Sequence, residues 1–100
     1  MELIKTLKAL NNEKRLQILE WLKLPEGNFP PHNDGKGFDQ GVCVSNIQDK
    51  LELSQSATSQ YMSMLESANL VISTRIGKWT YYRRNEEAIA DFADFVKNSL

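Results

Sequence analysis

The fold of this chain is decided by the uncharged polar stretch Ser54-Gln55-Ser56-Ala57-Thr58-Ser59-Gln60-Tyr61. A short helix is predicted just before it, from Ser45 through Leu51, and Leu53-Ser54 interrupts the helical pattern. Ser54 is a good N-cap, because its hydroxyl can accept a hydrogen bond from a free N–H group of a second helix that extends to about Ser67. The sequence therefore predicts two short helices joined by a tight connection, with hydroxyls and amides at the start of the second.

A basic β-hairpin is predicted directly after this helix. β-branched residues indicate a strand over residues 70–74, a second strand covers residues 79–82, and Arg75-Ile76-Gly77-Lys78 forms the turn. Residues 71–84 carry a net charge of +4 and no acidic side chain. Two such helices with this hairpin form a winged helix-turn-helix, in which a polar helix start and a basic wing are a nucleic-acid footprint. Taken alone, the polar stretch is equally typical of a solvated capping region, and the basic hairpin favours DNA.

The remaining helices make the domain mainly α. Apolar residues at helical spacing predict helices over about residues 3–10 and 13–22, and Asn12 is the expected N-cap of the second. Ser45-Asn46-Ile47-Gln48 matches a capping box, in which Ser45 would accept a hydrogen bond from the N–H of Gln48. A last helix is expected from about Glu86.

Residues 1–100 are expected to form one domain, in the order of four helices, a small β-hairpin and a fifth helix. Pro25 should stop the second helix and begin a long loop at about residues 25–41, which is rich in Pro and Gly. Residues 42–44 then form a brief extended entry to the helix that follows. Asn69 is a plausible left-handed residue at the end of the polar helix.

Composition and charge exclude several classes of protein. The 100 residues carry a net charge of −1, with 41% hydrophobic and 25% charged residues, which is typical of one soluble globular domain. Apolar runs are too short to span a bilayer, and the first residues lack the pattern of a secretory signal. The single cysteine favours a reducing cytoplasm. The net charge is close to zero because a basic hairpin is balanced by an acidic loop and an acidic last helix. This separation of charge permits DNA binding on one side of the protein.

Five motifs are spread along nearly the whole chain, with the loop at residues 25–40 as the main insertion: Leu7-Lys8-Ala9-Leu10, Lys14-Arg15-Leu16-Gln17-Ile18-Leu19, Leu53-Ser54-Gln55-Ser56-Ala57-Thr58-Ser59-Gln60-Tyr61, Ala68-Asn69-Leu70-Val71 and Gly77-Lys78-Trp79-Thr80-Tyr81-Tyr82-Arg83. In this order they resemble the ArsR/SmtB family of bacterial transcriptional repressors. The resemblance implies a homodimeric winged helix-turn-helix repressor of an inverted-repeat operator in double-stranded DNA. It also implies a dimer interface formed by the first and last helices, and an effector that releases the DNA.

The resemblance places functional residues on three parts of the chain. In the recognition helix it implies DNA contacts by Ser54, Gln55, Ser56, Thr58, Ser59, Gln60 and Tyr61. In the wing it implies contacts by Arg75, Gly77 and Lys78. At the dimer interface it implies Leu3, Ile4, Leu7, Phe92, Phe95 and Val96. The chain departs from the family where Ala57-Thr58 and Gln60-Tyr61 replace a usual Thr-Val and Arg-His, so a phosphate or guanine contact of that arginine is lost.

Neither of the metal sites familiar in the family is expected here. Cys43-Val44-Ser45 stands where many members have Cys-Val-Cys, and one thiolate cannot hold a soft metal. The last helix offers Glu86, Glu87, Asp91 and Asp94 without histidine, which is typical of a solvated face. His32, beside Asn33 and Asp34 with Asp39 further on, is expected to be an exposed loop residue. We therefore predict no metal and no cofactor.

Two other features leave alternatives open. Cys43 could be an oxidisable sensor thiol, but no Lys, Arg or His adjoins it in sequence, which favours a buried small apolar residue. The aromatic residues Trp21, Trp79, Tyr81 and Tyr82 could line a pocket for an organic effector, although such spacing is more typical of a core.

The sequence thus predicts a DNA-binding transcriptional regulator, a cytoplasmic repressor without a membrane partner. The first alternative is a winged-helix module that binds another protein and no DNA. An enzyme is disfavoured, because one cysteine, one histidine and scattered acids form no nucleophile–base set.

Overall fold

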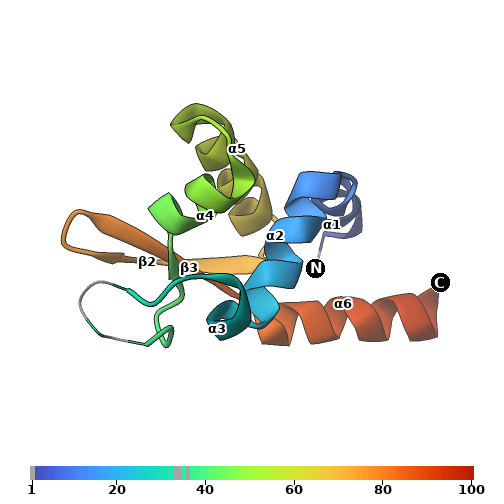
Figure 1. Ribbon diagram of the computed structural model, residues 1–100. Helices are drawn as coiled ribbons and strands as arrows, with labels where there is room; N and C mark the ends of the chain where they lie inside the picture. The colour runs from blue at the N-terminus through green and yellow to red at the C-terminus, as the bar shows by residue number, and fades with distance from the viewer. Residues whose placement is uncertain (1, 33–34, 36) are drawn as a thin grey trace.

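A computed structural model describes residues 2–32, 35 and 37–100 of the chain. Met1 at the start, Asn33 and Asp34 beside His32, and Lys36 lie outside the described residues. The elements in chain order are α1 (Leu3–Leu10), α2 (Glu13–Lys23), α3 (Pro25–Asn28), β1 (Val42–Cys43), α4 (Val44–Leu51), α5 (Gln55–Ser67), β2 (Val71–Ile76), β3 (Trp79–Arg84) and α6 (Glu86–Ser99) (Figure 1).

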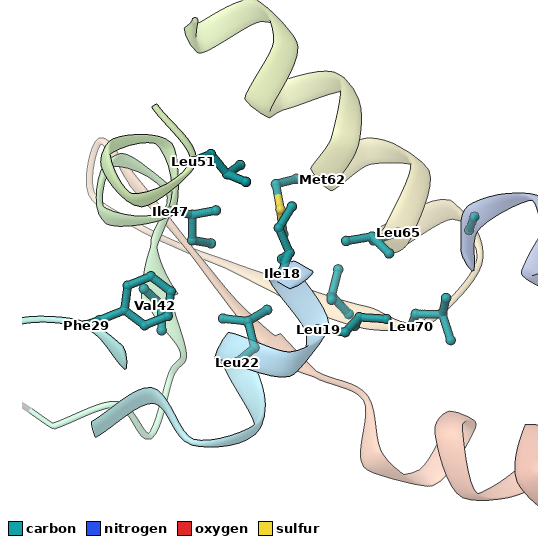
Figure 2. Close-up of a cluster of buried hydrophobic side chains, with 12 residues drawn as sticks. Ile18, Leu19, Leu22, Phe29, Val42, Ile47, Leu51, Met62, Leu65 and Leu70 are labelled. Atoms are coloured by element: carbon teal, nitrogen blue, oxygen red, sulfur yellow. The ribbon is translucent and has the colours of Figure 1, made fainter. Parts of the chain in front are cut away.

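One hydrophobic core joins the helices to the sheet. Ile18 of α2, Ile47 of α4 and Met62 of α5 are fully buried and face one another, as Figure 2 shows. Leu22 and Val42 extend this cluster toward β1. Because α2, α4 and α5 share a core, the polar face of α5 is held at a fixed angle to the rest of the domain.

The predicted helix-turn-helix is confirmed as α4, a short turn and α5. The turn begins at Glu52, which adopts the left-handed conformation with φ 57°, and Ser54 caps α5 by accepting a hydrogen bond from the N–H of Ala57 at 3.1 Å. Asn69 also adopts the predicted left-handed conformation after α5, with φ 63°. Asn12 caps α2 as expected, since its side chain accepts from the N–H of Arg15.

The sheet contains a third strand, for which the sequence predicted extended backbone but no pairing partner. The strand order is β1-β3-β2, and both pairs are antiparallel. The expected extended entry is β1, in which Val42 pairs with Tyr82 and Cys43 with Tyr81. The wing is therefore not a free hairpin, because its second strand is also hydrogen-bonded to the residues that lead into α4.

Two local predictions are wrong. The Pro-rich segment does not begin with a loop, because Pro25–Asn28 forms the short helix α3. Proline is tolerated in the first turn of a helix, since the N–H group that it lacks would have no partner there. Ser45 does not cap a helix either. Pairing of β1 with β3 lets α4 begin at Val44, and the Ser45 hydroxyl lies 3.3 Å from Cys43 Sγ.

The molecule is elongated, with principal extents of 44 × 25 × 24 Å. Figure 1 shows the tip of the β2–β3 hairpin at one end and the C-terminus of α6 at the other. Among the described residues of α6 none is buried. The last helix therefore projects from the core instead of completing it.

Candidate nucleic-acid interface

The start of α5 presents a polar surface without charge. Ser54, Gln55, Ser56, Ser59 and Gln60 are all exposed, as the sequence predicted for a recognition helix. Amide side chains of this kind can pair with the edge of adenine, and hydroxyls can bond to bases or to phosphates. The arrangement suits readout of base edges in a major groove.

Thr58 corrects the predicted contact set. Its side chain is 1% exposed, and its hydroxyl donates to the Ser54 carbonyl at 2.9 Å. The residue faces the core one turn after the cap and cannot extend toward a ligand outside. We therefore assign Thr58 to the core and not to the polar face.

Tyr61 lies between the polar face and the core. It is half-buried, and the guanidinium carbon of Arg15 lies 5.6 Å from the centre of its ring. Arg15 itself is buried, and it donates from Nε to the Ala9 carbonyl at 2.6 Å and from Nη2 to the Lys8 carbonyl at 3.0 Å. This contact, which sequence reasoning missed, connects the end of α1 to α5.

The wing places its predicted residues at an exposed tip. Gly77 has φ +60°, a conformation that glycine adopts without strain. Arg75 Nε donates to the Gly77 carbonyl at 3.0 Å, and Lys78 Nζ lies 5.3 Å from the centre of the Trp79 ring. The tip is therefore an ordered turn that carries two exposed cations.

One of the four basic residues of the hairpin has a structural role. Arg84 forms an ion pair with Glu86, with Nε 2.9 Å from Oε2, and it also donates to the Leu19 carbonyl at 3.5 Å. It joins the end of β3 to α2 and to the start of α6. The basic surface of the wing consists of Arg75, Lys78 and the exposed Arg83.

The six predicted interface residues lie on α1 and α6, and none of them is buried in the protomer. Ile4 is 62% exposed, Leu7 and Val96 are also exposed, and Leu3, Phe92 and Phe95 are half-buried. Figure 1 shows α1 and α6 at the end of the molecule opposite the tip of the β2–β3 hairpin. Apolar side chains left open on two neighbouring helices are typical of a protein interface.

Cys43 and His32, the two residues weighed as candidate sensor or metal-binding groups, lie close together at β1. Cys43 is buried, as its interpretation as a small apolar residue required. His32 is not the exposed loop residue predicted: it is half-buried, its Nε2 accepts a hydrogen bond from the Cys43 N–H at 3.4 Å, and its ring contacts Phe38 and Tyr81. In the described part of the chain, no group of three or more His, Cys, Asp or Glu side chains is placed to hold a metal ion.

The four aromatic residues divide between core and surface. Trp21 packs edge-to-face on Phe29, with ring centres 6.3 Å apart. Tyr82 is half-buried against the core, and burial, together with the negative charge of Glu66, raises the pKa of its phenol above the usual value. Trp79 is 46% exposed and does not belong to the core.

Within the described residues no helix combines the length and the apolar character needed to cross a membrane.

Comparison with known proteins identifies the family. Residues 39–73, which include the whole helix-turn-helix, match the model of the bacterial regulatory protein arsR family. An uncharacterized HTH-type transcriptional regulator, YbzH of Bacillus subtilis (strain 168), is 53% identical over the full length of both chains. The arsenical resistance operon repressor of the same strain is 32% identical over 82% of this chain and 65% of its own length.

Solved structures of related regulators share the fold. HlyU from Vibrio cholerae N16961 superposes with a TM-score of 0.62 at 27% identity, covering 97% of this chain and 91% of that one. The homodimeric winged helix-turn-helix DNA-binding domain of Mb0332 from Mycobacterium bovis gives a TM-score of 0.66 at 27% identity, covering 95% and 74%. The chain belongs to the arsR family of bacterial regulatory proteins and is a DNA-binding transcriptional regulator.

Proposed function

We propose that the chain is a homodimeric repressor that binds an inverted-repeat operator, with α5 in the major groove and the β2–β3 wing on the adjacent backbone. The observation that carries this proposal is that the domain presents both an exposed, uncharged start of α5 and an exposed basic wing tip. Base readout needs donors and acceptors on the helix, and phosphate attraction needs cations beside it. The two requirements are met by different elements of the same domain.

Within α5, we assign base contacts to the amides of Gln55 and Gln60. Both side chains are exposed, and glutamine can form two hydrogen bonds to adenine. The side chains of Ser54, Ser56 and Ser59 are shorter, so we assign them contacts to phosphates or to those bases that lie close to the helix backbone. The N–H groups at the start of a helix favour an anion, so a phosphate beside Ser54 would be stabilised there.

We assign the dimer interface to α1 and α6. Ile4, Leu7 and Val96 are exposed apolar residues, and among the described residues of α6 none is buried in the protomer. A second copy would cover these side chains and stabilise α6. The homodimeric state of the Mb0332 domain, a structural relative, supports this assignment. Two recognition helices would then need to lie about 34–36 Å apart to enter successive major grooves.

We infer that regulation does not use the thiolate metal site of the family's arsenical repressors. The chain has a single cysteine, which is buried, whereas a soft metal needs two or three thiolates. A sensor role for Cys43 would require an oxidant to reach a buried thiol. Retained peroxide sensitivity of DNA binding in Cys43→Ser would exclude that role.

The proposed function is tested by binding to the promoter of the chain's own gene. We expect the affinity to fall steeply between low and physiological salt, because bound phosphates release counterions. We also expect deletion of the gene to raise expression from that promoter. Absence of DNA binding, or an affinity independent of salt, would contradict the proposal and favour the protein-binding alternative.

A further inference from the structure

A hollow lies between the wing and the first helix of the helix-turn-helix. Its volume is about 400 Å³, within the range of small-molecule sites. Residues 30–32 of the long loop form one wall, Cys43, Ser45 and Asn46 form the second, and Trp79 and Tyr81 of β3 form the third. Three segments far apart in the sequence therefore meet around one space.

The walls of this hollow are held in place by contacts of the protein itself. The imidazole of His32 accepts a hydrogen bond from the Cys43 N–H, and its ring centre lies 5.4 Å from that of Tyr81. Phe38, further along the loop, also contacts His32, and the centres of the two rings lie 4.7 Å apart. A site whose walls are already ordered loses less entropy when a ligand enters.

The lining chemistry selects the class of ligand. Among the described residues that line the hollow none is Lys, Arg, Asp or Glu, so a bound ion would lose its hydration without a counter-charge in the lining itself. Trp79, two prolines and Tyr81 supply flat apolar surfaces. Ser45 and Asn46 add a hydroxyl and an amide that can orient one polar substituent.

We propose that this hollow binds the effector of the regulator, a small neutral aromatic molecule of one or two rings with a hydroxyl or carbonyl group. Trp79 lines the hollow and lies beneath the ammonium of Lys78, the cation at the tip of the wing. Ser45 and Asn46 belong to α4. A ring bound there contacts both the wing and the helix-turn-helix, so a ligand affinity that differs between the free and the DNA-bound arrangement of these two elements couples ligand binding to DNA binding.

Ligand binding itself does not depend on the proposed operator, whereas its effect on DNA rests on the proposed function. The first measurement is therefore made without DNA. The probes are p-cresol, its saturated analogue 4-methylcyclohexanol and its charged analogue p-toluate. The two tryptophan indole N–H signals are followed by NMR, with Trp21, outside the hollow, as the internal control.

We expect p-cresol to shift the Trp79 signal saturably, with a Kd of about 1 mM for a ligand of this size, and to leave Trp21 unchanged. The saturated and charged analogues should bind about ten-fold more weakly or not at all. A Trp79 signal that does not move, or equal shifts by all three probes, would overturn the proposed ligand class.

A pair of variants locates the site. Trp79→Leu should abolish saturation transfer from the protein to p-cresol, because the stacking surface is lost. Ile76→Ala removes an equally exposed apolar side chain, 45% against 46%, from the same hairpin but outside the hollow, and should leave binding intact. If both variants or neither lose binding, the hollow is not the site.

The second measurement adds promoter DNA. Saturating p-cresol should change the DNA affinity by about five-fold or more, the lower range of allosteric coupling. Binding of p-cresol at Trp79 with unchanged DNA affinity would overturn the effector role. Loss of DNA binding in the absence of any probe would instead contradict the proposed function, and the NMR result would still stand.

Discussion

The guanidinium carbon of Arg15 lies over the Tyr61 ring, 5.6 Å from its centre, while Nε of the same side chain donates to the Ala9 carbonyl at 2.6 Å. The buried cation is stabilised by the carbonyls at the end of α1, where the negative end of the helix dipole favours a positive charge, and by the face of the Tyr61 ring. One side chain of α2 thus fixes both α1, proposed to form the dimer interface, and α5, proposed to contact DNA.

Arg15→Lys should lower the free energy of unfolding by about 1–3 kcal/mol, because a lysine ammonium lacks the planar fork with which the guanidinium donates to both carbonyls while it faces the ring. Urea unfolding followed by circular dichroism measures the change. Lys14→Ala, an exposed neighbour on α2, is the control and should stay within about 0.5 kcal/mol of the parent. Equal stability of the two variants would show that the buried contact contributes nothing.

Gly41→Ala should destabilise the domain by about 3 kcal/mol or more, among the largest effects of a single substitution. Gly41 has φ +106°, and a Cβ there would overlap the Tyr82 carbonyl, where β1 is joined to β3. Gly27→Ala is the matched control, because its Cβ meets open space. Thermal unfolding of both variants tests the prediction, and a Gly41→Ala protein as stable as Gly27→Ala would contradict the close approach.

Ile4→Glu should convert the protein to a monomer, since a charge would be buried in the proposed α1–α6 interface. Sedimentation equilibrium gives the mass. Leu24→Glu replaces an equally exposed apolar residue, 66% against 62%, outside that interface, and should remain dimeric. A dimeric Ile4→Glu protein would place the interface elsewhere.

Gln55→Ala should weaken binding to the operator by about 1–3 kcal/mol per lost amide–base pair and leave binding to unrelated DNA nearly unchanged. Fluorescence anisotropy with operator and scrambled duplexes measures both affinities. The control is Gln17→Ala, exposed on α2 and outside the proposed contact set. Equal losses on the two duplexes would mean that Gln55 does not read bases.

Lys78→Ala should weaken binding to every DNA sequence, and the slope of log K against log salt should shallow by about 0.9 per protomer. Lys23→Ala removes an exposed cation from the end of α2 and should not change the slope. An unchanged slope in Lys78→Ala would remove the wing tip from the DNA contacts.

Sequence predicted the parts of the fold that depend on local signals. The caps Asn12 and Ser54 and the left-handed Asn69 each rest on a side chain and its own backbone, and all three are confirmed. The prediction of a capping box at Ser45 was wrong because β1 pairs with a strand about 40 residues further along the chain, and local sequence patterns contain no information on such a pairing. The short helix at Pro25 was missed because a proline that stops one helix can also begin the next.

The polar start of α5 was predicted as a whole, but its orientation was not. A run of hydroxyls and amides has no apolar stripe to set the helix phase, so Thr58 could not be separated from its exposed neighbours. Arg15 and Arg84 were missed for another reason. Their roles depend on carbonyls and an acid on other elements, whereas their sequence context shows only charge.

The separation of the hairpin tip from α6 along the 44 Å axis has a consequence for the length of DNA that a dimer covers. Two protomers joined through α1 and α6 would carry their wings on the outer flanks of the pair. Nuclease protection should then extend past the two major-groove half-sites into the minor grooves beyond them. Base changes in those flanks would act through groove width, with narrow A·T-rich flanks favoured by the basic tips.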